Sequence, residues 1–275
     1  FYDSGWDNFR DGFGKNIGAD YSNKKLKKIL QDLFKGTTMR DIHTKYNPKK
    51  YLMVSAFNIN PFEDGKPVNF KPTVFNSSFV RDEKETLVDI ALRTSAGPTY
   101  FPIFEKQYID GGVAMNHPAM AAVAFAINNQ SNGKGMYVKP GGNRKGLGKS
   151  ASDIKVLSIG CGTSNKNFIP ANKIKDGDWG NLQWVKYLPD LLTESNVQAS
   201  DYYVRHVLDE ENYQRIQLEF DSDKAPAILR GKSLGLDVRD PHLLDAMRQY
   251  AESYFDENKK SILEFLDLGS NPLTA

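Results

Sequence analysis

The stretch best suited to chemistry is Asp110-Gly111-Gly112, which follows the short extended run Gln107–Ile109. A carboxylate at the end of a strand, before two glycines, points into open space over a backbone that can bend sharply. Such an acid can orient and polarise a partner group without a bulky neighbour in the way. The same triplet is also ordinary turn chemistry, because Asp tolerates turn geometry and glycine supplies positive φ. The triplet alone leaves both interpretations open.

The residues around the triplet carry a more specific pattern. They are Thr94-Ser95-Ala96, Pro98-Thr99-Tyr100-Phe101-Pro102, and Asn116 with Pro118. Together with the triplet they closely resemble the patatin-like phospholipase family, whose segment runs from a TSAAPTYFP-type motif to a strand, a DGG or DGA, and an NNP. The chain departs from that pattern at Gly97, which replaces the commoner Ala, and at His117, which replaces the second Asn.

The resemblance implies a fold and an activity. Patatin-like proteins are three-layer α/β hydrolases of acyl lipids that use a Ser–Asp dyad and need no cofactor. Their serine lies in a G-x-S-x-G elbow, and a G-G-G-x-R-G loop supplies the oxyanion hole. Asp110 matches the family's aspartate, with Gly111 and Gly112 as its supporting motif. Its implied role is to take or orient the serine proton during attack on a fatty-acyl ester, as in phospholipase A or lysophospholipase chemistry.

The resemblance covers about residues 20–265 and corresponds to the family's C-terminal two-thirds. The sequence contains no glycine-rich oxyanion loop and no credible serine elbow. We expect both upstream of Phe1, so the N-terminal part of the fold would be missing or lie on another chain. The alternative is a non-catalytic patatin scaffold that binds a lipid or a partner. The retained Asp110 favours the hydrolase.

Several patterns invite over-interpretation. Gly231 to Gly235 spells G-x-S-x-G around Ser233, but neither flank has the strand or helix that a nucleophile elbow needs. Gly148-Lys149-Ser150 lacks the earlier glycine of a phosphate-binding loop. Cys161 lies between two glycines, where packing explains it better than nucleophilic chemistry. The four histidines show no ligand spacing, so no metal site is expected; they are His43, His117, His206 and His242.

Composition limits the class of protein. The 275 residues are 40% hydrophobic and 25% charged, which fits one globular domain with a sizeable core. The net charge of +2 gives no overall field for nucleic acid, and one cysteine excludes an internal disulfide framework. No apolar run approaches the ~20 residues that span a bilayer. We expect a cytoplasmic or membrane-peripheral protein whose substrate is a phospholipid or another acyl lipid.

The pattern of apolar residues predicts the strands and helices that must position Asp110. Strands are expected over Tyr51–Phe57, Pro72–Asn76, Lys155–Ile159 and Tyr213–Phe220. Helices are expected over Glu83–Arg93, after Pro118, over Asn181–Leu192 and Glu194–Leu208 with a break near Pro189, and after Asp240. Buried strands alternating with helices predict an α/β fold with a mostly parallel central sheet.

We expect residues 1–20 to form an irregular approach and residues 21–275 the catalytic domain. A basic amphipathic helix begins near Ser22 and carries four lysines between Lys24 and Lys28. A peripheral membrane contact through this helix is one interpretation, and an ordinary solvated face is the other.

Overall fold

The computed structural model describes residues 19–46, 50–128, 146–164, 169–232, 234–235 and 238–267. The chain divides into two compact units. The first comprises Phe1–Ser150 and Leu191–Tyr203, and the second comprises Ala151–Asp190 and Val204–Ala275. Most of the expected irregular approach over residues 1–20 lies outside the described residues, so that boundary stays a prediction.

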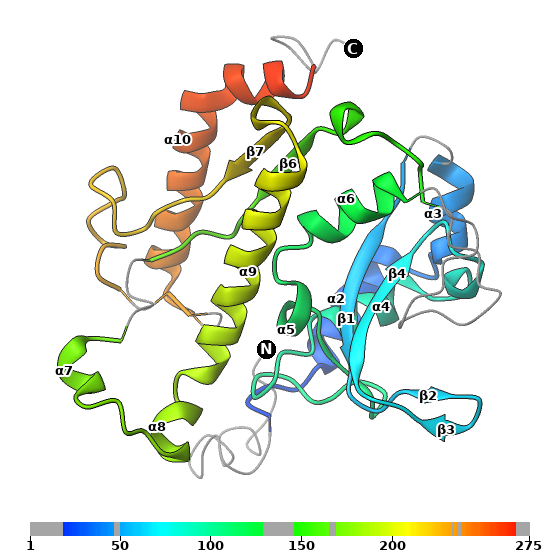
Figure 1. Ribbon diagram of the computed structural model, residues 1–275, viewed down its shortest axis with the longest axis horizontal. Coiled ribbons are helices and arrows are strands. Elements are labelled where there is room, and N and C mark those ends of the chain that lie inside the picture. The colour runs from blue at the N-terminus through cyan, green and yellow to red at the C-terminus, as the bar shows by residue number, and fades with distance from the viewer. Residues whose placement is uncertain are drawn as a thin grey trace. The chain divides into compact units, whose positions relative to one another are not determined.

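The first unit is built on a three-stranded antiparallel sheet in the order β4-β1-β5 (Figure 1). Its strands are β1 (Met53–Asn58), β4 (Lys71–Asn76) and β5 (Tyr108–Asp110). Two of them confirm the strands expected near Tyr51–Phe57 and Pro72–Asn76. A short hairpin of β2 (Phe62–Glu63) and β3 (Lys66–Pro67) links β1 to β4.

Five helices of the first unit accompany this sheet in the described residues. They are α2 (Lys24–Phe34), α3 (Met39–Tyr46), α4 (Leu87–Thr94), α5 (Gly112–Met115) and α6 (Ala119–Ile127), with a 3-10 turn, η1, at Val80–Asp82. Thr86 caps α4 by accepting a hydrogen bond from the Asp89 N–H at 3.1 Å. The core of the unit forms where Met39, Ala56, Phe75 and Ile90 pack together.

Arg93, near the end of α4, ties the helix to the sheet. Its guanidinium is buried and pairs with Glu85 at 2.6 Å and Glu105 at 3.0 Å. It also lies over the rings of Phe75 and Tyr108, 5.0 and 4.8 Å from their centroids. The planar fork of arginine allows ion pairing and ring stacking at once. This contact holds the N-terminal end of β5, two residues before Asp110.

Helix α6 is less buried than its sequence predicts. The run is apolar nearly all round, which is typical of a helix packed deep in a core. In the structure only Ala119 and Val123 are buried, and Ile127 is 37% exposed. A helix without a polar face gives no indication of which side faces solvent, so patterning could not reveal the exposed side.

The second unit contains a two-stranded parallel sheet of β6 (Val156–Ile159) and β7 (Tyr213–Ile216). Its other described elements are the 3-10 turns η2 (Ala151–Asp153) and η3 (Glu210–Asn212) and the helices α7 (Ala171–Ile174), α8 (Asn181–Val185) and α10 (Pro241–Phe265). Asp240 caps α10 by accepting from the His242 N–H at 2.9 Å. Trp179 packs edge-on against Trp184 and stacks on Tyr187, with ring centroids 5.3 and 5.4 Å away.

Helix α9 (Leu188–Val207) runs without interruption through the expected break. We expected two helices here, with a break near Pro189. Instead Pro189 occupies the first turn of one long helix. Proline is tolerated there because its missing N–H has no partner in the first turn anyway.

The described elements confirm an α/β fold. The mostly parallel central sheet is not confirmed, because the sheets are small and the three-stranded one is antiparallel. In the described part of the chain, no helix is long and apolar enough to cross a bilayer.

Candidate active site

Asp110 lies at the end of β5, opposite Ala56 of the central strand β1. Its backbone N–H donates to the carbonyl of Ala96 at 3.0 Å, and the next N–H, of Gly111, donates to Thr94 at 3.3 Å. The small residues after α4 therefore run alongside the Asp-Gly-Gly triplet. The structure brings together the two parts of the motif that lie about a dozen residues apart in the sequence.

The carboxylate of Asp110 is held on one side only. Oδ1 accepts a hydrogen bond from the Gly112 N–H at 2.6 Å. Oδ2 makes no hydrogen bond to any described residue and lies next to Gly97, where an added Cβ would be 3.6 Å away. The glycine found here instead of the commoner Ala leaves slightly more room beside that oxygen. One oxygen is fixed and the other is available to a partner group.

Burial raises the pKa of the Asp110 carboxyl above its ordinary value, and the Gly112 N–H opposes this shift by stabilising the charged form. No charged side chain among the described residues contributes to the shift. A carboxylate with a raised pKa is a stronger proton acceptor than an exposed one. The environment therefore suits a general base better than a plain turn residue.

Position 111 requires a glycine because there is no room for a side chain, and not because of its backbone conformation. Its φ is −64°, which any residue can adopt, although the turn interpretation supposed a positive φ. A Cβ at this position would clash with the carbonyl oxygen and the hydroxyl of Ser55 in β1. At Gly112 a Cβ would lie 3.0 Å from oxygen atoms of Asp110 and Asn116, which is tight but not prohibitive. Gly111 thus lets the chain pass directly against β1.

Sequence reasoning missed the side chain that holds the segment after the triplet. Asn196, on α9, contacts the backbone of α5 through both ends of its amide. It is separated from Asn116 by 80 residues. Periodicity places Asn196 on a helix but carries no signal of what that helix contacts.

Comparisons with known proteins bear on the family resemblance. The family model described as Patatin-like phospholipase matches residues 1–123, which include the triplet. "Patatin-like protein 2" of Arabidopsis thaliana is 28% identical over 255 residues, covering 84% of this chain and 58% of the relative. "Patatin-01" of Solanum tuberosum is 25% identical over 234 residues, covering 79% and 56%.

The predicted resemblance is confirmed: this chain is related to the patatin-like phospholipases. It spans somewhat more than half of the length of the curated relatives it matches.

Among the described residues, none of the other candidates makes a hydrogen bond with Asp110. Ser233 lies outside the described residues, and its described neighbours on either side form neither a strand nor a helix. Cys161 is a free, exposed thiol after β6. His117 is buried and contacts α9. Within the described ranges, no group of three or more His, Cys, Asp or Glu side chains could hold a metal ion.

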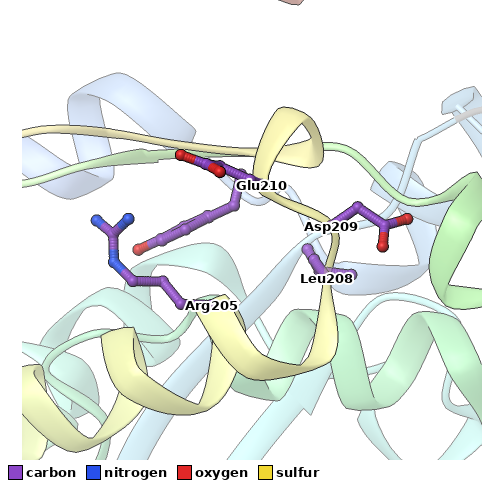
Figure 2. Close-up of a pocket in the computed structure, with 5 residues that line it drawn as sticks. Arg205, Leu208, Asp209 and Glu210 are labelled. Atoms are coloured by element: carbon purple, nitrogen blue, oxygen red, sulfur yellow. The ribbon is translucent and has the colours of Figure 1, made fainter.

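A cavity of about 430 Å³ belongs to the second unit and is not built on Asp110 (Figure 2). Its lining residues are Arg205, Leu208, Asp209, Glu210 and Tyr213. The Arg205 guanidinium lies 5.0 Å from the centroid of the Tyr213 ring, and two acidic side chains line the same space. The lining contains no Ser, Thr or Cys side chain that could act as the nucleophile of an acyl transfer.

Proposed function

We propose that the protein containing this chain is a lipid acyl hydrolase of phospholipase A or lysophospholipase type. It cleaves fatty-acyl ester bonds with a Ser–Asp dyad to which this chain contributes Asp110. The nucleophile-bearing segment completes the site from elsewhere in the protein or from another chain. The proposed substrate is a phospholipid or another acyl lipid, reached through peripheral contact with a membrane surface.

The observation that carries the proposal is the state of the Asp110 carboxylate. It is half-buried, fixed by one backbone N–H, and free of described partners at Oδ2. Burying a charge costs free energy unless the charge is paired and hydrogen-bonded, and a residue that only forms a turn would not require that cost. The match of residues 1–123 to the Patatin-like phospholipase model supports a lipid acyl hydrolase family.

In the proposed reaction Asp110 accepts the proton of the serine hydroxyl while the serine oxygen bonds to the ester carbonyl carbon. The tetrahedral intermediate collapses when the ester oxygen leaves as an alcohol, taking that proton. Water then attacks the acyl carbon of the acyl-enzyme while Asp110 takes a proton from the water. The bond to the serine oxygen breaks as Asp110 returns that proton to it, and the fatty acid is released. Splitting the hydrolysis into two steps is the ordinary advantage of a covalent nucleophile.

The test is Asp110→Asn in the natural protein that contains this chain. Asn is nearly isosteric, and its Oδ1 can still accept from the Gly112 N–H, so the fold should remain. It cannot accept the serine proton, and turnover of a phospholipid or short acyl ester should fall by about 10²–10⁴. Circular dichroism is the folding control. A folded Asn variant within a few-fold of the parent would show that Asp110 is only a turn residue.

The matched control is Asp64→Asn, in the exposed turn between β2 and β3, which should leave turnover unchanged. Asp64 has φ of 50°, a conformation that Asn tolerates as well as Asp. His117→Ala is a poor control, although a Ser–Asp dyad needs no imidazole, because His117 is buried against α9. Ser233→Ala should leave activity intact. A loss of activity in this variant would instead identify Ser233 as the nucleophile.

The second candidate function is a lipid- or partner-binding module without catalysis. A serine-directed fluorophosphonate separates the two. The hydrolase should be labelled covalently at one serine and inactivated in proportion to labelling. An unlabelled protein that still binds acyl lipids would support the binding module and contradict the dyad.

A further inference from the structure

The segment after the Asp-Gly-Gly triplet is held by α9 through polar contacts. The Asn196 side chain accepts from the Asn116 N–H at 3.1 Å and donates to the carbonyl of Ala114. One amide therefore satisfies a backbone donor and a backbone acceptor at the end of α5. A side-chain amide is suited to this, because it carries a donor and an acceptor at fixed spacing.

Two further contacts lie next to Asn196 along α9. The Ser200 hydroxyl donates to the carbonyl of His117 at 2.7 Å, and the His117 Nδ1 lies 3.3 Å from the carbonyl of Val197. Ser200 and His117 are both buried. The residues Leu191–Tyr203 accordingly group with the first unit, although the rest of α9 does not. These contacts lie within one compact unit.

Helix α5 needs such support because it has only four residues. A single turn fixes several backbone dihedrals for one or two hydrogen bonds and does not persist alone in water. The turn begins at Gly112, whose N–H holds Asp110 Oδ1. Gly112 therefore belongs both to α5 and to the only described hydrogen bond to the carboxylate.

We propose that Asn196 is a positioning residue for Asp110. By fixing α5 at its end, Asn196 keeps the Gly112 N–H on Oδ1 and so keeps Oδ2 beside Gly97. The effect on catalysis rests on the proposed function, whereas the effect on Asp110 itself does not. Asn196 acts through the α5 backbone and touches neither the carboxylate nor, in the proposed reaction, the substrate.

The experiment compares Asn196→Ala with Gln198→Ala in the same protein. Gln198 lies on the same helix and is exposed, and among the described residues its amide bonds only to Glu194, one turn away. The first readout is hydrogen exchange at the Gly112 amide. Loss of the two Asn196 hydrogen bonds should speed that exchange by about tenfold or more, because one net hydrogen bond is worth about 1 kcal/mol. Gln198→Ala should leave it unchanged.

The second readout is the pKa of the Asp110 carboxyl, followed by carbon NMR. It should rise in Asn196→Ala, because a hydrogen bond to the charged form is lost while the sheet still holds Asp110 in its half-buried place. Where turnover is measured, kcat should fall with KM nearly unchanged, and the acid limb of the pH profile should move upward with the pKa. A merely structural role would lower thermal stability without moving the pKa.

Asn196→Asp distinguishes hydrogen bonding from packing. It keeps the size and the acceptor but presents an oxygen to the Ala114 carbonyl, so it should behave like Asn196→Ala. Parent-like exchange and pKa in both variants would overturn the proposal. Altered exchange and an altered pKa without any change in turnover would support the positioning of Asp110 by Asn196 and refute the catalytic role of Asp110. Failure of the positioning proposal can therefore be told apart from failure of the proposed function.

Discussion

Replacing Gly111 by Ala should disrupt the contact between the Asp-Gly-Gly triplet and β1. The added Cβ would overlap the carbonyl oxygen and hydroxyl of Ser55. Ser55 cannot retreat easily, because it lies in the central strand of the sheet opposite Val74. Overpacking of this kind costs about 1–3 kcal/mol, and a clash with backbone belongs at the upper end. At about 2–4 °C for each kcal/mol, the melting temperature should fall by about 6–12 °C.

Two other glycines make the measurement specific. Gly36→Ala adds a Cβ with nothing within 4 Å and should change stability by less than about 0.5 kcal/mol. Gly112→Ala should fall between the two, because its tight contacts include the Asn116 side chain, which can move. That order fits the DGA variant of the resembled motif, in which Ala stands at the position of Gly112.

The assay is thermal unfolding followed by far-UV circular dichroism, with the three variants at equal concentration. The reasoning would be refuted if Gly111→Ala melted within about 1 °C of the parent, or if Gly36→Ala were as destabilised as Gly111→Ala. Either result would mean that the chain can move away from β1 at little cost. The close approach would then be incidental to the site.

Two other predictions concern pH and lipid. Because the pKa of Asp110 is raised in the folded state, the folded protein binds the proton more tightly, and stability falls as pH rises from about 3.9 through the folded pKa. Asp110→Asn should therefore melt above the parent at pH 7, with the difference shrinking towards pH 4, and a lower melting temperature at pH 7 would contradict this. Replacing the four lysines at the start of α2 by Gln should weaken binding to anionic vesicles without abolishing it, because the exposed Ile29 and Leu33 remain. The four charges together are worth at most about 4 kcal/mol near such a surface. Complete loss of binding would show that the lysine face matters more than we infer.

The sequence was sufficient for most elements of the first unit. The apolar run from Tyr51 to Phe57 has the length and boundaries of a strand, and β1 occupies it within one or two residues. The sequence did not predict whether neighbouring strands run parallel or antiparallel. A continuous apolar run favours a strand of a parallel sheet, but β1 carries such a run and pairs antiparallel with both of its neighbours. The parallel arrangement was inferred from alternation with helices, which holds for β6 and β7 but not for β1.

The sequence predicted the parts of the site that are formed by residues adjacent in the chain. Asp110 and its glycines could be singled out because their types and order are unusual together. The reason for Gly111 was not predictable, since it depends on the position of Ser55 across the sheet. The contact of Asn196 with α5 joins positions 80 residues apart and requires the tertiary structure. Polar helix residues are mostly exposed, so nothing in the sequence marked this one.

The aromatic cluster of Trp179, Trp184 and Tyr187 gives the protein an internal optical reporter. The sequence contains three tryptophans, and the two in the described residues both belong to the second unit. The third, Trp6, lies outside the described residues. Intrinsic fluorescence will therefore respond mainly to the second unit, while far-UV dichroism averages over the whole chain. Coincident melting curves from the two signals would indicate a single cooperative transition, and separated curves would assign the fluorescence step to the second unit.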